Sequence, residues 1–432
     1  MKRISLSTIL IVFILYAPYI ANAQQEKRWL KHHISLLTTP SMLGRGYVNK
    51  GHDRAAKYVL KYFKEYGLLP VNKDSTYIQT YSFTVNTFPD EVSLKLNKKQ
   101  LVPGADFLVD AASNSFNTDK IKVSSVDLNK IKDTTTWNKT KATWHADNKA
   151  YFLKNTDSFC KHLSISERRF AKQLPKGCFL IPQHGKITWT VATDTIPATV
   201  FYIEDTVSPR RVKKAAVHVN AVYLPAAKNK NENIIGCVPG EVRDSFIVFT
   251  AHYDHLGAMG KEAYFPGASD NASGTAMLLY LANYFAKNPQ HYTMVFIAFS
   301  GEEAGLLGSS YFVNHPMIPL DHIRFLTNLD IMGDATDGIT VVNATEFSKQ
   351  FDALQRINNS KNYLPQIKSR GKAANSDHYH FTEAGVPSFF IYTNGGKGFY
   401  HDVFDNAASL SMTNIDMLAK LLIAFAKELN VP

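Results

Sequence analysis

The pattern of apolar and polar residues changes character twice along this chain. Residues 28–66 have helical spacing, and from Arg54 onward they carry an apolar stripe on one side. Residues 104–228 are polar and rich in threonine and lysine, and short β-type runs such as 179–181 and 198–203 interrupt them. This middle segment therefore predicts a β-rich unit that differs from the sequence on either side.

From residue 233 onward, apolar strand-like runs alternate with segments of helical periodicity. The predicted strands cover residues 246–250, 294–299, 325–330 and 387–392. The predicted helices cover residues 271–287, 306–313 and 415–429. This alternation is typical of an α/β fold with a mostly parallel, mixed sheet that helices flank on both faces. Residues 24–103 and 229–432 would form this α/β domain, and the β-rich segment 104–228 would be inserted into it.

The first 23 residues have the organisation of a secretory signal peptide. Lys2 and Arg3 form a basic start, Ile9–Tyr16 is apolar, and Ala21–Ala23 supplies a small-x-small cleavage site. The apolar run is too short to span a membrane comfortably, and no cysteine follows the cleavage site. We therefore expect an exported protein, periplasmic or secreted, that keeps no stable membrane anchor once residues 1–23 are removed.

Composition adds two exclusions. The net charge is +11, but the lysines are scattered, and the densest basic cluster, 210–214, has no accompanying aromatic residues. We expect a solvated basic surface and no nucleic-acid partner. The three cysteines are too few for a disulfide framework, although a bond between Cys160 and Cys178 stays possible in an exported chain.

Acidic residues and histidines follow the predicted strands and open one predicted helix. They are His252, Asp254, Asp270, Glu302, Glu303, Asp330 and His401. An adjacent Glu–Glu pair alone is also typical of a solvated turn, but the carboxyl ends of parallel strands meet at one edge of a sheet. Carboxylates gathered there repel one another, and a divalent metal ion compensates them. Zn²⁺ accepts such a mixture of imidazole and carboxylate ligands.

Six ordered motifs give this chain a specific resemblance. AHYDHLG, GASDNASGTA, FSGEEAGLLGS, NLDIMG, NSDHYHF and FYHDVFDN resemble the bacterial leucyl aminopeptidase/aminopeptidase Y family of di-zinc metallopeptidases. The resemblance is strong from Asn233 to Asn406, and the middle insertion is similar to a protease-associated domain in position and texture. It implies a zinc exopeptidase-like fold and hydrolysis of N-terminal residues from peptides that have a free N-terminus.

The resemblance also implies a role for each site residue. Of two zinc ions per chain, one would be bound by His252 and Asp330 and the other by Glu303 and His401, with Asp270 bridging both. Glu302 would be the general base for a metal-bridged water. Asp254, which would orient His252, and Asp377 and Asp405 are expected just outside the ligands.

The resemblance leaves several residues without a role, and it leaves two alternative functions. The resemblance gives His255 and His378 no ligand role, and His380 stands where the family usually has proline. The tyrosine that polarises the substrate carbonyl in some members has no evident counterpart before Ser376. A single-zinc glutaminyl cyclase and a catalytically inactive binding homologue are the alternatives, and the sequence does not indicate side-chain preference or oligomeric state.

Overall fold

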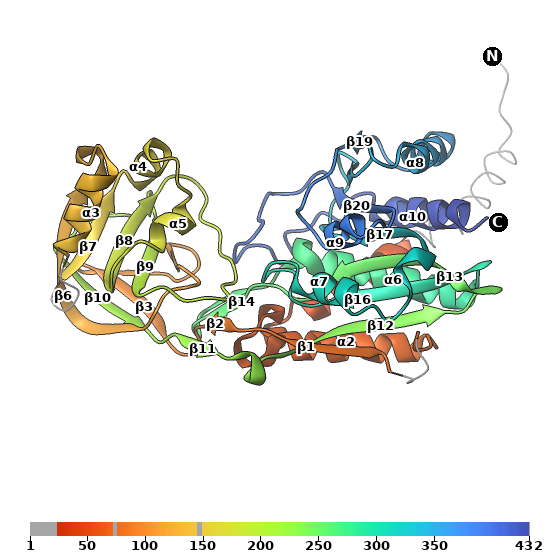
Figure 1. The fold of residues 1–432 in the computed structure, drawn as a ribbon, viewed down its shortest axis with the longest axis horizontal. Coiled ribbons are helices and arrows are strands. Elements are labelled where there is room, and N and C mark those ends of the chain that lie inside the picture. Colours follow the sequence, from red (N-terminus) through yellow and green to blue (C-terminus); the bar gives the residue numbers. More distant parts are fainter. Residues whose placement is uncertain (1–23, 72–75, 145–148, 432) are drawn as a thin grey trace, which may run out of the picture.

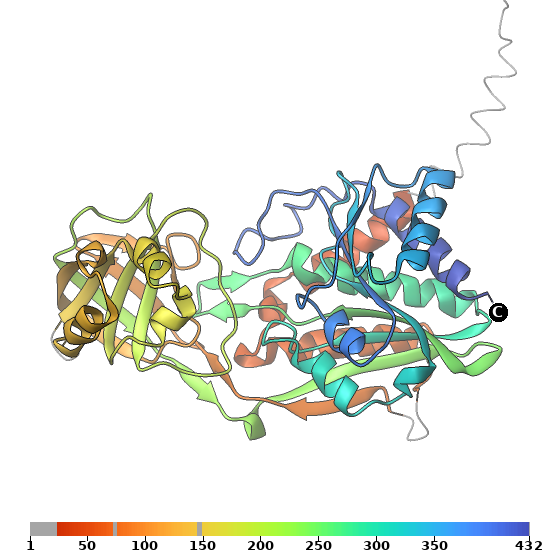
Figure 2. The ribbon, with the colours of Figure 1, turned by 45° about the horizontal axis from the view of Figure 1, so that its top comes forward.

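The computed structural model describes residues 24–71, 76–144 and 149–431, so the predicted signal peptide lies outside the described residues. These residues form two lobes that lie side by side, each built on an eight-stranded sheet (Figure 1). A view turned by 45° separates the same two lobes (Figure 2). We call the part made of residues 24–84 and 225–431 the first lobe, and residues 88–221 the second lobe.

The sheet of the first lobe has four neighbouring parallel strands at its centre. Its strand order is β1 (Ile78–Ser82), β12 (Lys230–Val238), β16 (Tyr292–Phe299), β13 (Val242–His252), β17 (Ile323–Leu329), β20 (Ser388–Thr393), β18 (Ile339–Val342) and β19 (Ile367–Ser369). Strands β16, β13, β17 and β20 run parallel, and β19 runs parallel to β18. The antiparallel pairs are β1 with β12, β12 with β16 and β18 with β20. The predicted mixed, mostly parallel sheet is therefore confirmed.

Helices cover both faces of this sheet. The helix of residues 24–37, α2 (Gly51–Glu65), α6 (Gly274–Lys287), α8 (Ser348–Lys361) and α10 (Ile415–Leu429) contribute to one apolar core. The second core includes residues of α7 (Leu307–Asn314) and α9 (His378–Glu383). Because successive side chains of a strand point to opposite faces, β13 sends Ile247 and Phe249 into the first core and Val248 into the second. Burial on both faces explains its continuous apolar run.

The sheet of the second lobe combines antiparallel and parallel strands. Its order is β4 (Lys99–Leu101), β3 (Val92–Leu96), β10 (Lys214–Val219), β6 (Phe116–Asp127), β7 (Lys149–Lys154), β8 (Gly177–Gln183), β9 (Ala198–Glu204) and β5 (Phe107–Val109). The helices α3 (Thr134–Ala142), α4 (Thr156–His162) and α5 (Glu167–Ala171) accompany the strands. The boundary predicted at residue 104 needs correction, because β3 and β4 precede it and yet pair into this sheet.

The chain crosses between the lobes through a two-stranded ribbon. Strand β2 (Val85–Thr87) leads into the second lobe, and β11 (Val222–Leu224) leads out of it. The two strands pair antiparallel, Val85 opposite Leu224. The apolar core of the second lobe also takes in Met259 and Phe265, from the hairpin β14 (Gly257–Met259) and β15 (Ala263–Phe265). The lobes therefore share a packed junction.

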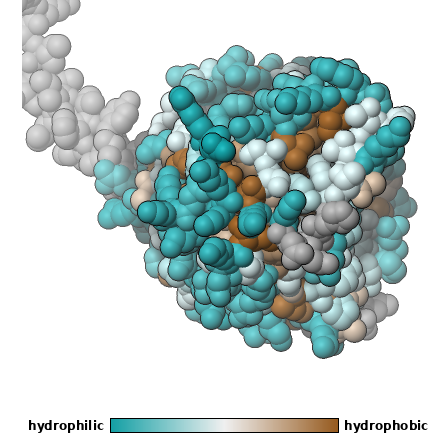
Figure 3. All heavy atoms as spheres, turned by 90° about the vertical axis from the view of Figure 1, so that its left-hand side faces the viewer, coloured by the Kyte–Doolittle hydropathy of each residue, from teal (hydrophilic) through white to brown (hydrophobic). Residues whose placement is uncertain are grey.

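Three further observations concern the surface of the second lobe, the cysteines and the length of the helices. The outer end of the second lobe is largely hydrophilic, with small apolar patches between polar side chains (Figure 3). Cys160, Cys178 and Cys237 are buried and unbridged. Within the described ranges, no helix combines the length and the apolar character needed to cross a bilayer.

Candidate metal centre

Four adjacent parallel strands bring the predicted site residues to one edge of the first-lobe sheet. His252 is the last residue of β13, and Asp330 directly follows β17. Glu302 and Glu303 follow β16, and His401 lies in the loop after β20. Asp270 lies in η5 (Ala268–Ser273), the irregular turn before α6. The topology thus brings together residues that lie up to about 150 positions apart in the sequence.

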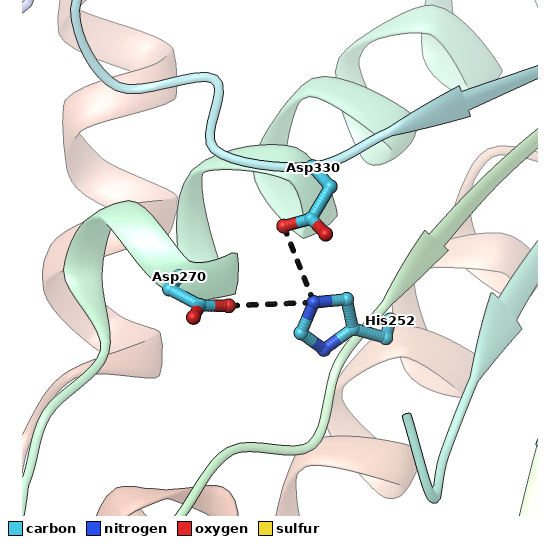
Figure 4. A group of neighbouring side chains, drawn as sticks. All are labelled: His252, Asp270 and Asp330. Carbon is cyan, nitrogen blue, oxygen red and sulfur yellow. Dashed lines mark hydrogen bonds and ion pairs between the residues drawn. The ribbon is translucent and has the colours of Figure 1, made fainter. Parts of the chain in front are cut away.

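His252, Asp270 and Asp330 form a tight buried group (Figure 4). Nε2 of His252 lies 3.4 Å from Oδ1 of Asp270 and 3.3 Å from Oδ1 of Asp330. Charge-assisted hydrogen bonds are usually shorter, about 2.7–2.9 Å. Two ligand atoms on a tetrahedral zinc ion, with bonds of about 2.0–2.1 Å, lie about 3.3 Å apart. The spacing of this group therefore fits ligands of a metal ion.

The second oxygen of Asp270 faces a second group. Nε2 of His401 lies 3.2 Å from Oδ2 of Asp270 and 3.1 Å from Oε2 of Glu303. This nitrogen is buried and has no well-directed hydrogen bond. Asp270 thus presents one carboxylate oxygen to each imidazole, which is the arrangement that a carboxylate shared by two ions requires.

The raised pKa values of two histidines show that the carboxylates of this cluster stabilise positive charge. Burial lowers the pKa of His252, but the nearby carboxylates of Glu302 and Asp330 outweigh burial and raise it well above its usual value. Burial also opposes the shift at His401, where Glu303 and Asp270 raise the pKa to about 11. Protons on these imidazoles therefore take the place that metal ions would have, because metal ligation needs neutral imidazole.

The pKa values of the carboxylates shift in opposite directions. Burial would raise the pKa of Asp270, yet its contacts with His252 and His401 hold it well below the usual range. The pKa of Glu303 falls to about 2, against burial, because His401 and His255 face it. The pKa of Glu302 rises well above its usual value through burial and through Glu303. The pKa values of two adjacent glutamates therefore shift in opposite directions, because only Glu303 faces two imidazoles.

Asp254 supports this glutamate pair rather than only His252. Its Oδ1 accepts the backbone N–H of Glu302 at 3.3 Å, and its Oδ2 accepts that of Glu303 at 3.4 Å. The predicted contact with His252 is made chiefly through the backbone, since Nδ1 of His252 lies 3.2 Å from the carbonyl of Asp254 and 3.8 Å from its carboxylate. The carboxylate thus fixes the turn that separates the directions of Glu302 and Glu303.

The other two predicted outer residues differ in their contacts. Asp405 accepts the backbone N–H of Ser269 at 2.9 Å and that of Asp270 at 3.1 Å, so it holds the turn that carries Asp270. Asp377 is buried, and burial raises its pKa to about 7, but it makes no described hydrogen bond to a ligand. Its neighbour Ser376 does, since its hydroxyl donates to Oδ2 of Asp330 at 2.9 Å.

Arg45 is the buried cation that sequence reasoning missed. It is the one arginine or lysine that is fully buried among the described residues, and burial lowers its pKa to about 10. All five guanidinium N–H groups point to backbone carbonyls, among them those of Tyr253 at 2.9 Å and Asp270 at 3.2 Å. Arg45 therefore ties the end of β13 to the turn of Asp270.

Tyr47 and His255 complete the surroundings of the glutamates. The hydroxyl of Tyr47 donates to Oδ2 of Asp254 at 2.6 Å. Nδ1 of His255 lies 2.6 Å from Oε1 of Glu303, on the oxygen that does not face His401. His378 and His380, the two histidines that follow Ser376, make no described contact with these glutamates. His378 is buried against Phe390, and His380 is half-buried.

Comparison with known proteins finds peptidase relatives for part of this chain. Residues 233–426 match the sequence model described as Peptidase family M28. The chain is 29% identical over 247 residues to aminopeptidase YwaD of Bacillus subtilis, which covers 54% of this chain and 51% of that protein. It is 28% identical over 212 residues to a probable leucine aminopeptidase of Arthroderma otae, which covers 47% and 58%. The chain thus spans about half the length of these curated relatives.

Solved structures extend the likeness in fold to nearly the whole chain. A zinc aminopeptidase from Bacillus subtilis superposes with a TM-score of 0.65 at 19% identity, over 93% of this chain and 94% of that one. An aminopeptidase from Aneurinibacillus sp. strain AM-1 gives a TM-score of 0.61 at 19% identity over 94% of both chains. The two-lobed arrangement therefore also occurs among solved aminopeptidase structures.

We predict that Arg45→Met destabilises the protein by at least about 3 kcal/mol, because the substitution removes the guanidinium donors of five buried carbonyls and leaves the acidic cluster without its cation. Urea unfolding measures this, with Arg54→Met, an exposed arginine on α2, as the matched control. A loss below about 1 kcal/mol, similar to the control, would contradict the structural role given to Arg45.

We predict that zinc affinity falls as pH falls. The raised pKa values of His252 and His401 mean that zinc must displace protons at neutral pH, so each displaced proton lowers the affinity about tenfold per pH unit below those pKa values. Competition with a chelator of known proton affinity at pH 6, 7 and 8 measures the slope. Affinity that does not change with pH would show that these imidazoles are not ligands.

Proposed function

We propose that the protein is a metallo-aminopeptidase that uses two zinc ions per chain, on the basis of the match of residues 233–426 to the sequence model of Peptidase family M28. The likeness to named aminopeptidases over about half of the chain supports this activity. The bound metals would be held by the residues that the sequence predicts: His252 and Asp330 at one position, Glu303 and His401 at the other, and Asp270 at both.

The observation that carries the proposal is the orientation of Asp270. Its two oxygens lie 3.4 Å and 3.2 Å from Nε2 of two different imidazoles, those of His252 and His401. A single-ion site needs no such division, because one monodentate oxygen satisfies one ion. The geometry therefore favours a two-ion centre over the single-zinc site of a glutaminyl cyclase, and a complete ligand set disfavours an inactive binding homologue.

Zinc ions in such a pair supply a low-pKa water and polarise the scissile carbonyl. The protein must then supply a base, and the position of Glu302 supports this role. Its Oε2 lies 4.0 Å from Nε2 of His252, farther than the oxygens of Asp270 and Asp330, so it stands beside the ligands rather than among them. We propose that Glu302 takes the proton of the attacking water and delivers it to the leaving amine.

We also propose that the enzyme cleaves from the N-terminus. The free α-amine of a peptide would sit close to the metals and the acidic residues, and the likeness to named aminopeptidases supports this mode. We also propose that the chain is exported, on the basis of the basic, apolar and small-x-small pattern of residues 1–23.

An assay with two substrates tests the function. Purified protein is offered an aminoacyl-nitroanilide and, separately, a peptide that begins with glutamine. We expect release of nitroaniline that a chelator abolishes and zinc restores. Cyclisation of the glutaminyl peptide without nitroaniline release would favour the glutaminyl cyclase, and a fully active protein without transition metal would contradict the proposal.

We predict that substitutions of the adjacent glutamates separate base from ligand. Glu302→Gln keeps the side-chain volume and both zinc ions, but the rate falls by roughly 10²–10⁴ because the base is lost. Glu303→Gln replaces an anionic ligand, so zinc content falls toward one ion per chain. Asp270→Asn weakens both positions. Zinc content and rate are measured on the same preparations of the three variants.

The opposite pattern would reverse the roles of the two glutamates. If Glu302→Gln loses a zinc ion while Glu303→Gln keeps both, then Glu303 acts as the base. Asp321→Asn, a change of the same kind on the surface turn η6 (Leu320–His322), serves as the control and should alter neither zinc content nor rate.

A further inference from the structure

The second lobe contributes no candidate ligand, but one of its loops reaches the metal centre. This loop, residues 184–197, connects β8 to β9 and packs into the junction between the lobes. Trp189, near its middle, is buried. The indole N–H of Trp189 donates to the carbonyl of Val109 at 2.7 Å, and its ring stacks on Phe265 with 4.7 Å between centroids. The position of Trp189 is therefore fixed by both lobes.

The backbone of Trp189 holds the candidate ligand His401 from two directions. The N–H of Trp189 donates to the carbonyl of His401 at 3.0 Å. The carbonyl of Trp189 lies 2.9 Å from Nδ1 of His401, which donates to it. With a proton held on Nδ1, Nε2 is the nitrogen left for a metal ion, and it lies on the side of Asp270 and Glu303. A second hydrogen bond of this kind orients a metal-binding imidazole and fixes its tautomer.

Lys186 secures the chain around the same histidine. Its ammonium group lies 2.7 Å from the carbonyl of Gly398, 2.6 Å from that of Tyr400 and 2.8 Å from Oδ2 of Asp402. These three acceptors use all three N–H donors of a lysine. The bonds therefore clamp the loop on both sides of His401 to the second lobe.

The backbone of His401 needs such support. Its φ is +58°, in the left-handed region that costs a residue with a Cβ atom about 1 kcal/mol or more. Residues in this conformation persist when their surroundings fix them. The hydrogen bonds from Trp189 and Lys186 supply that constraint from outside the loop.

We propose that loop 184–197 is a positioning element of the metal centre: Lys186 and the backbone of Trp189 hold His401 in its ligand orientation and so set the affinity for one of the two metal ions. This rests on the proposed di-zinc function. Docking of the second lobe then becomes a condition for occupancy of the position shared by Glu303 and His401, whereas the position of His252 and Asp330 does not depend on it.

The test uses the full chain with Lys186→Met, which keeps the length of the side chain and removes its donors. Zinc retained per chain is measured as a chelator lowers free zinc. We expect one of the two ions to bind about tenfold more weakly, as for other residues that orient a ligand, and the other ion to bind as in the wild type. Trp189→Phe keeps an aromatic ring but loses the hydrogen bond to Val109, so the affinity for the same ion should fall.

Lys172→Met is the matched control, because Lys172 also pairs with this loop, at Asp194 with 2.5 Å between Nζ and Oδ2, but has no described contact with the loop of His401. It should leave both affinities unchanged. Equal weakening of both ions in Lys186→Met would show general destabilisation and overturn the proposal. So would wild-type affinities for both ions.

Hydrogen exchange of residues 398–404 in the metal-free protein separates this inference from the proposed function. Exchange should be faster in Lys186→Met than in the wild type and unchanged in Lys172→Met. Unchanged exchange in Lys186→Met would overturn the clamp itself, whatever the protein catalyses. A wild-type chain that binds no zinc would instead overturn the proposed function.

Discussion

Mutual repulsion among buried carboxylates is the constraint on which the rest of this structure depends. Asp254, Asp270 and Asp330 are buried and Glu302 and Glu303 are partly buried at one edge of a sheet, where water screens their charges poorly. Three kinds of group compensate this negative charge. They are imidazoles with raised pKa values, the buried guanidinium of Arg45, and backbone N–H groups that donate to Asp254 and Asp405. Without metal these compensations remain incomplete, since the pKa of Glu302 stays raised. The fold therefore gathers negative charge that the proposed metal ions would compensate.

The parallel centre of the sheet produces this concentration. Because β16, β13, β17 and β20 point the same way, four loops open at the same edge. Hydrogen bonds between these loops then fix the side chains: Asn271 donates to the carbonyl of Leu329 at 2.9 Å, and Thr275 donates to that of His252 at 2.9 Å. The rigidity of the site thus comes from contacts between neighbouring strand ends rather than from any one loop.

The sequence predicts those parts of the site that depend on local order. Strand ends, the helix of residues 415–429 and the ligand candidates follow from apolar periodicity and short motifs, and the structure brings all five candidates together. The sequence does not predict Arg45, because four of its five partners are backbone carbonyls more than two hundred residues away, which leave no side-chain pattern. The boundary at residue 104 failed for a related reason: the pairing of β3 with β10 is decided by strands about 120 positions apart.

The ribbon of β2 and β11 brings the two ends of the second lobe side by side. A segment whose ends meet can be gained or lost by a chain without moving the domain that receives it, because a short turn can rejoin the cut ends. Here such modularity has a limit. A shortened descendant that lost the second lobe would keep all five candidate ligands, but Nδ1 of His401 would lose the carbonyl of Trp189, and the loop around His401 would lose its bonds to Lys186. The inheritance of the first lobe is therefore tied to the second lobe through the loop that carries this imidazole.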